Sequence, residues 1–331
     1  MYLAGQVPPE SPPSDRSRAP GGSRAPGGSR ARGRARAPGV RSGSSRALLS
    51  AVATLAVLSV AVAIIGHRDT DAARAASPPR ASARTAGGEL LYRVVGCRST
   101  GAVAHREGPR RMEVAIGFDD GPWTDTPAFV TMLERNHAMA TFFMIGRQLG
   151  AAQRPLLLRE LRAGDLLGDH TYSHPDLTRI SAAGVRAQLQ HGIDAIRADS
   201  GYTPCLFRPP YGAYDASVLR IARSLGLSTV LWNVDPADYT RPGTGAIEQR
   251  VLAQVRPGSI IISHDGGGPR GQTLAAYPGI IRKLRARGYR IVTMLEMLGY
   301  RPVYEPCIKL CDGIGVARTQ LPRRAIIAQA P

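Results

Sequence analysis

The chain has 331 residues and a formal net charge of +18, and nine of its first 46 residues are arginine. This length has room for one large domain with appendages or for two ordinary domains. No aromatic-rich or helix-turn-helix pattern accompanies the positive charge, so we expect no nucleic-acid partner. The charge instead favours attraction to an anionic membrane surface or cell-wall polymer.

Residues 1–46 are predicted to be a disordered cytoplasmic tail. They hold two acidic residues beside the nine arginines, and a near-repeat of six residues at Ser17–Gly22 and Ser23–Gly28. Because almost nothing in this stretch can be buried, ordering it would not offset the loss of conformational entropy.

Residues 47–66 form a run of twenty residues without a charge. A helix needs about 20 apolar residues to cross the hydrocarbon core of a bilayer, so we predict a single-pass transmembrane signal anchor. The arginines before it should stay in the cytoplasm, which places the rest of the chain outside the cell membrane. An Ala-x-Ala pattern at Ala73–Ala75 leaves cleavage and secretion as the alternative.

Residues 67–110 are predicted to be an extracytoplasmic linker, since the stretch up to Gly88 is rich in Ala, Arg, Ser and Pro. Cysteines in an exported chain favour disulfides. The four cysteines allow three pairings, between which the sequence does not decide: Cys97, Cys205, Cys307 and Cys311.

From residue 111 to residue 300, short apolar or β-branched runs alternate with longer amphipathic stretches. The runs predict seven strands, at Met112–Phe118, Ala140–Ile145, Asp165–Gly168, Cys205–Phe207, Ser228–Asn233, Ser259–Ser263 and Arg290–Leu295. The stretches predict six helices, at Thr126–Asn136, Pro155–Ala163, Ser181–Ser200, Asp215–Leu225, Thr244–Val255 and Thr273–Arg287. Such alternation indicates an α/β fold with a parallel sheet and right-handed crossovers.

Polar motifs follow five of the predicted strands. They are Asp119–Pro122, His170–His174, Arg208–Gly212, Asp235–Tyr239 and His264–Asp265. In an open sheet, motifs on five strands could not all reach one site, whereas the carboxyl ends of barrel strands converge on one mouth. We therefore predict a distorted, incomplete (β/α) barrel of about seven parallel strands.

Asp119 and Asp120 stand side by side where the first predicted strand meets an Asp-Gly-Pro turn. Successive strand residues point to opposite sides, but two aspartates can converge where the strand breaks. One carboxylate could then bind a cation while the other accepts protons.

His170 and His174 are four residues apart, the spacing at which two imidazoles chelate one ion on a helical turn. Two His and one Asp suit a catalytic Zn²⁺ site, which leaves one position open for water. Arg208–Gly212 is a stiff loop that could present a guanidinium and a backbone N–H to this site. His264, at the end of a buried-looking strand, could act as a general acid.

In this order, the five motifs closely resemble those of the polysaccharide deacetylase family, the NodB-homology domain. The resemblance covers Met112–Leu298 and implies a catalytic domain at residues 111–300, followed by a C-terminal extension at 301–331. It implies that Asp120, His170 and His174 bind a divalent metal, with Zn²⁺ favoured and Co²⁺ or Ni²⁺ as alternatives.

The resemblance also implies a set of catalytic roles. Asp119 matches the general base, and Arg208 the residue that holds this base in place. Tyr211 matches the residue whose backbone N–H binds the oxyanion. His264 matches the general acid, and Asp238 the carboxylate that tunes it.

The match has one ambiguity and two differences. Asp235 is a nearby rival of Asp238 for the role of tuning carboxylate. Tyr239 stands where the fourth motif usually ends in Trp, and Ser263 stands where an aliphatic residue is usual. Neither difference removes a catalytic group, so an active enzyme is expected.

The activity implied by the resemblance is metal-dependent removal of N-acetyl groups from a polysaccharide that contains N-acetylglucosamine. Peptidoglycan and chitin-type oligomers are the expected substrates, and acetate is the expected product. Two alternatives stay open: an O-acetyl xylan or other ester deacetylase with the same catalytic groups, and a catalytically inert glycan-binding module.

Overall fold

The computed structural model describes residues 91–100, 104–307, 311 and 315–328. The predicted tail at 1–46, the predicted membrane anchor at 47–66 and the linker up to residue 90 lie outside these residues. Within them, no helix combines the length and the apolar character needed to cross a membrane.

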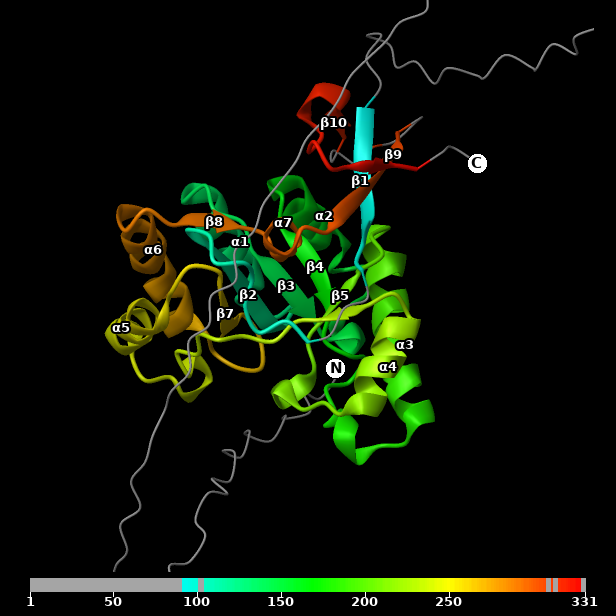
Figure 1. Ribbon diagram of the computed structural model, residues 1–331, viewed down its shortest axis with the longest axis horizontal. Helices are drawn as coiled ribbons and strands as arrows, with labels where there is room; N and C mark the ends of the chain where they lie inside the picture. Colours follow the sequence, from blue (N-terminus) through cyan, green and yellow to red (C-terminus); the bar gives the residue numbers. More distant parts are fainter. Residues whose placement is uncertain (1–90, 101–103, 308–310, 312–314, 329–331) are drawn as a thin grey trace, which may run out of the picture. The chain divides into compact units, whose positions relative to one another are not determined.

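A curled sheet of parallel strands forms the centre of the described part (Figure 1). Its strands are β2 (Glu113–Gly121), β3 (Thr141–Met144), β4 (Leu166–Asp169), β5 (Leu206–Phe207), β6 (Ser228–Thr229), β7 (Ser259–His264) and β8 (Arg290–Val292). The strand order is β6-β5-β4-β3-β2-β7, and β8 pairs with the start of β2. A single parallel bridge between Val234 and Ile261 links the segment after β6 to β7. The predicted parallel α/β fold with a barrel-like curl is thus confirmed.

Helices flank this sheet, with α5 and α6 on one side of the view and α3 and α4 on the other (Figure 1). The helices are α1 (Thr126–Arg135), α2 (Arg154–Ala163), α3 (Ala182–Ser200), α4 (Ala216–Ser224), α5 (Thr244–Gln254), α6 (Gly271–Ala286) and α7 (Met294–Leu298). Short 3-10 turns, η1 (Gly146–Gln148), η2 (Leu177–Arg179), η3 (Pro210–Gly212) and η4 (Asp238–Thr240), lie in the connections, and η5 (Arg318–Gln320) follows β10.

Local sequence signals explain most helix boundaries. The Ser181 side chain accepts a hydrogen bond from the first turn of α3, and the helix ends at Gly201 in the left-handed conformation. The Asp215 side chain caps α4 in the same way. The predicted strand at 290–295 was too long, because the Thr293 side chain caps α7 and ends β8 at Val292.

The core lies between the sheet and its covering helices. Phe118 of β2 makes edge-to-face contacts with Phe129 of α1 and Tyr277 of α6, with ring centroids 4.9 Å and 4.8 Å apart. All nine residues of β2 are buried, so the strand that carries the first polar motif runs through the core. This burial fixes the position of the motif at its end.

A second, mostly antiparallel sheet corrects two boundary predictions. It has the order β10-β1-β9-β11, from β1 (Leu91–Arg98), β9 (Arg301–Pro306), β10 (Val316–Ala317) and β11 (Ile326–Ile327). The predicted linker at 67–110 therefore contains a strand, and the predicted extension at 301–331 pairs with it. This sheet was not predicted, because its two main strands are about 200 residues apart in the chain and no local turn joins them.

A disulfide joins this second sheet to the barrel. Cys97 of β1 bonds to Cys205, directly before β5, whereas Cys307 and Cys311 are free thiols. Thr203 also donates a backbone hydrogen bond to Val95 of β1. The contact is made at the amino end of the parallel strands.

Candidate functional site

The polar motifs that follow β2, β4, β5 and β7 meet at the carboxyl ends of the parallel strands. Asp119, at the end of β2, is directly opposite His264 of β7 in the strand register. His170 follows β4, and its backbone N–H donates to Met144 at the end of β3. Arg208 follows β5, and its backbone N–H donates to Asp169 of β4.

The two aspartates are brought together by the backbone conformation of the second. Asp120 has a φ of 71°, in the left-handed region that few residues other than glycine adopt. This conformation interrupts the strand alternation, so both carboxylates, 2 % and 5 % exposed, are buried at one site. Hydrogen bonds hold the turn, since Ile145 donates its backbone N–H to Gly121.

Asp120, His170 and His174 form a group that could hold a metal ion. The Nε2 atoms of His170 and His174 lie 3.5 Å and 3.2 Å from Asp120 Oδ1. One ligand atom from each residue falls within 4.8 Å of the others. His170 Nδ1 contacts the carbonyl oxygen of Arg208 at 2.6 Å, and as a donor there it leaves Nε2 facing the site.

The ligand atoms fit a divalent cation. Asp120 Oδ1 is buried and accepts no hydrogen bond within the described part of the chain. Oxygen and imidazole nitrogen are ligands that Zn²⁺ binds. His174 has a φ of 63°, and its backbone N–H donates to the Thr171 hydroxyl, which fixes the turn that follows His170. The site therefore offers one buried anionic oxygen and two imidazoles.

Electrostatics at this group favour a cation. Burial would raise the pKa of Asp120, but the imidazoles of His170, His264 and His174 outweigh it and lower the pKa. Burial and the nearby His170 lower the pKa of His174 to about 4, so its ring is neutral near pH 7. Burial would also lower the pKa of His170, but Asp119 and Asp120 raise it. A proton and a divalent cation therefore compete for this position.

Arg208 is fully buried and fixes Asp119. Its Nη1 donates to Asp119 Oδ1 at 2.7 Å, while Nε and Nη2 donate to the backbone carbonyls of Val230 and Leu231. The guanidinium lies 4.2 Å from the ring centroid of Phe143. A Cβ at Gly117 would lie 2.6 Å from Nη1, so only glycine leaves room for this arrangement. Asp119 is thus held with one oxygen toward Arg208.

His264 and Asp238 form the second buried pair of the site. Asp238 accepts hydrogen bonds from His264 through both its carboxylate oxygens, from Nδ1 at 2.8 Å and from the backbone N–H at 2.9 Å. Burial would lower the pKa of His264, but the charges of Asp238, Asp120 and Asp119 outweigh it and raise the pKa to about 10. The structure places Asp238 beside His264, whereas Asp235 accepts a hydrogen bond from the backbone of its own loop, at Ala237.

Two tyrosines border the group. Tyr211 has a φ of 59°, and its exposed ring stands edge-on to His174 with centroids 4.8 Å apart. Tyr239 stands edge-on to His264 with centroids 5.7 Å apart, so the residue in the usual place of a tryptophan lies beside the His264 imidazole. All eight predicted site residues lie in the loops and strand ends of one rim.

Sequence reasoning missed Gln148 at this site and gave Asp265 no role. Gln148 donates a side-chain hydrogen bond to the Asp120 carbonyl at 3.1 Å. Asp265 is fully buried, and burial together with the charges of Asp120 and Asp119 raises its pKa to about 7 despite a hydrogen bond from Thr126. Asp265 belongs to the predicted motif His264–Asp265, which was the one available signal; nothing in the sequence marks Gln148.

Comparisons with known proteins agree with this geometry. The profile of the family named polysaccharide deacetylase matches residues 106–230. A peptidoglycan-N-acetylglucosamine deacetylase of Bacillus cereus is 37 % identical over 194 residues, which are 57 % of this chain and 89 % of the relative. A chitooligosaccharide deacetylase of Sinorhizobium fredii is 40 % identical over 199 residues, covering 56 % of this chain and 92 % of the relative.

A solved structure is also similar to this chain. It is a peptidoglycan N-acetylglucosamine deacetylase crystallised in complex with 4-naphthalen-1-yl-N-oxidanyl-benzamide. It superposes with a TM-score of 0.57 at 32 % identity, and the match covers 59 % of this chain and 92 % of that one.

Proposed function

Because the chain belongs to the polysaccharide deacetylase family, we propose that it removes N-acetyl groups from a polysaccharide containing N-acetylglucosamine. The observation that carries this proposal is the convergence of Asp120, His170 and His174 beside a carboxylate held by Arg208 and an imidazole held by Asp238. These are the groups that hydrolysis of an amide requires: a base, an acid and a site for a positive charge.

The metal centre is assigned to Asp120, His170 and His174, with Zn²⁺ as the favoured ion and Co²⁺ or Ni²⁺ as alternatives. Such an ion supplies Lewis acidity to a carbonyl and makes water more acidic. Asp119 would accept the proton of the attacking water, because its second oxygen, Oδ2, is 4.0 Å from His170 Nε2 on the side of the metal ligands. By binding Asp119 Oδ1, Arg208 would keep Oδ2 directed at the metal ligands.

The remaining residues would stabilise the oxyanion and release the amine. The backbone N–H of Tyr211 is assigned to the oxyanion, a contact typically worth about 3–4 kcal/mol. An amine leaves poorly unless it is protonated, and His264 would donate that proton. Asp238 keeps the imidazole charged and oriented by accepting its Nδ1–H.

The proposed substrates are acetylated glycans of the peptidoglycan or chitin type, in keeping with the relatives named above. The test is acetate release by the full-length protein in mild detergent, supplied with Zn²⁺ or Co²⁺. We expect release from N-acetylglucosamine oligomers and from peptidoglycan, and much less from O-acetylated xylan. Release from xylan alone would identify an esterase, and no release from any of the three would identify an inert glycan-binding module.

We further propose that residues 47–66 anchor the chain in the cell membrane with its catalytic domain outside. The Cys97–Cys205 disulfide supports this location, because disulfides persist in oxidising compartments. Protease added to protoplasts should therefore digest the catalytic domain while a cytoplasmic marker protein stays intact. Protection of both proteins to the same degree would refute the location, and recovery of the domain in the medium would indicate cleavage near Ala75.

A further inference from the structure

A pocket of about 540 Å³ lies on the same rim as the metal ligands. Its walls come from the loop after β2, with Trp123, from Gln148 in η1 after β3, and from the first turns of α1 and α2, with Pro127 and Gln153. Pro122 belongs both to the pocket wall and to the turn that follows Asp120. The pocket therefore opens beside the metal site and not on a separate face.

Trp123 is exposed although its backbone is firmly held. Its side chain is 40 % accessible, while its backbone N–H donates to the buried Thr126 hydroxyl at 2.7 Å. Among the large apolar side chains that the structure describes as exposed, the aromatic ones are Trp123, Tyr172 and Tyr211, which follow β2, β4 and β5. Aromatic rings presented at the rim of a site are ready-made surfaces for the apolar face of a ligand.

Gln148 connects the pocket to the metal ligands. Its side-chain N–H donates to the Asp120 carbonyl, and its Oε1 is buried without a hydrogen-bond partner in the described part of the chain. A buried carbonyl oxygen without a donor is costly, and a ligand hydroxyl could supply one. Gln153 also lines the pocket, and its side-chain amide does not cap the helix that it precedes.

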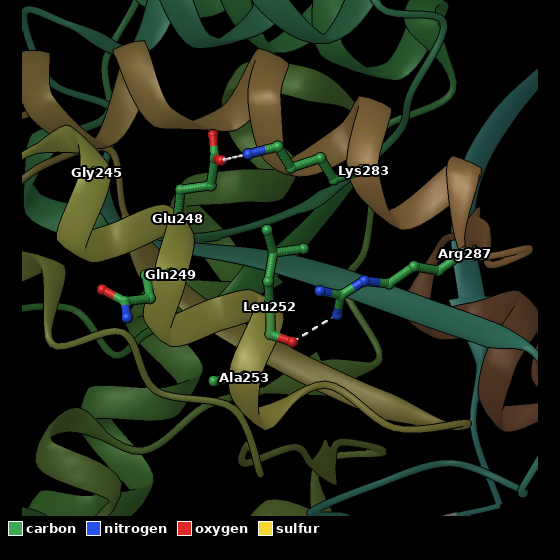
Figure 2. Close-up of a pocket in the computed structure, with 7 residues that line it drawn as sticks. All are labelled: Gly245, Glu248, Gln249, Leu252, Ala253, Lys283 and Arg287. Carbon is green, nitrogen blue, oxygen red and sulfur yellow. Dashed lines mark hydrogen bonds and ion pairs between the residues drawn. The ribbon is translucent and has the colours of Figure 1, made fainter.

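The absence of charge in the lining indicates the kind of occupant. None of the residues around this pocket carries a charge. The comparable pocket of about 350 Å³ between α5 and α6 is different, as Figure 2 shows: Glu248 pairs there with Lys283, and Arg287 donates to the Leu252 carbonyl. An aromatic ring, amide groups and no charge suit a neutral sugar ring better than an anion or a peptide.

We propose that the Trp123 pocket binds a neutral pyranose residue of the glycan, next to the residue whose acetamide reaches Asp120, His170 and His174. The indole of Trp123 stacks on the face of the sugar ring, and the amides of Gln148 and Gln153 bind its hydroxyl groups. This inference rests on the proposed function, because it assigns the neighbouring sugar of the same substrate.

The kinetic test replaces Trp123 by alanine in the full-length protein. Loss of the stacking surface should raise KM about tenfold for the N-acetylglucosamine hexamer, with a much smaller change in kcat. KM for the N-acetylglucosamine monomer, which has no neighbouring sugar, should change less than KM for the hexamer, and Trp123→Phe should restore part of the loss. Gln249→Ala removes an exposed amide from the other pocket and should leave both KM values as they are.

A binding measurement separates this inference from the proposed function. The chain has two tryptophans, so hexamer added to the protein should change the fluorescence, and Trp123→Phe should remove most of that change. An unchanged KM for the hexamer in Trp123→Ala, with normal acetate release, would overturn the pocket and leave the function intact. A Trp123-dependent fluorescence change without acetate release would leave the pocket intact and overturn the function. Urea midpoints equal to that of the unmodified protein show that the variants fold.

Discussion

Replacing His170 by alanine is expected to abolish both metal binding and acetate release. The imidazole supplies one of three ligand atoms, and its Nδ1 contact with the Arg208 carbonyl keeps the other nitrogen directed at Asp120. Partners behind a metal ligand are typically worth about 10–100-fold in metal affinity, so loss of a ligand itself should cost more. Metal content after dialysis and acetate release from the hexamer measure the two effects.

The matched control for this variant is His137→Asn. His137 is an exposed imidazole after α1 with a φ of 48°, a conformation that asparagine tolerates. It should keep full metal content and full activity. Chelator-treated unmodified protein should regain activity with Zn²⁺ or Co²⁺, whereas the His170 variant should not. One equivalent of metal bound by His170→Ala with normal affinity would refute the assignment of this ligand.

Replacing His264 by alanine is expected to lower the rate of acetate release without any loss of metal, unlike the replacement of His170. A general acid contributes about 10²–10⁴-fold, so kcat for the hexamer should fall by that factor. An aryl acetate has a leaving group that needs no proton, and its hydrolysis should fall far less. Equal losses on both substrates would mean that His264 acts on something other than the leaving amine.

The pH dependence of Asp238→Asn tests the same acid by a second route. Asp238 is the main group that raises the pKa of His264 to about 10, against the effect of burial. The acid works in its protonated form, so activity is lost as the pH rises through this pKa. Removing the carboxylate lowers the pKa, and the alkaline limb of kcat/KM should move to lower pH. An unmoved alkaline limb would show that His264 does not control it.

The sequence predicted the parts of the fold that depend on neighbouring residues. Helix caps such as Ser181 and Asp215 and the buried run of β2 act locally, so their periodicity marks the elements directly. The small sheet escaped prediction because the whole barrel lies between β1 and β9 in the sequence, so their pairing is non-local and leaves no local signal. The pairing of Cys97 with Cys205 could not be predicted for the same reason, because Cys97 lies in β1 and its position depends on that sheet.

The site was predictable to the extent that its residues stand at strand ends. Parallel strands bring their carboxyl ends to one rim, so Asp120, His170 and His264 could be grouped from the chain alone. The sequence could not decide whether Asp238 or Asp235 lies beside His264. That depends on the backbone between them, where Ala237 is in the left-handed conformation. Metal identity depends on coordination number and ligand competition, which residue order does not encode.

The position of the small sheet, formed by β10, β1, β9 and β11, determines where the preceding chain enters the domain. β1 and β9 run side by side, and the Cys97–Cys205 bond fastens them near the start of β5, at the pole opposite the Asp and His side chains. Whatever leads into Leu91 thus attaches to the back of the barrel. Under the anchoring proposed above, the segment that enters at Leu91 and the rim that holds the Asp and His side chains would be at opposite ends of the domain, so the attachment would leave the rim open.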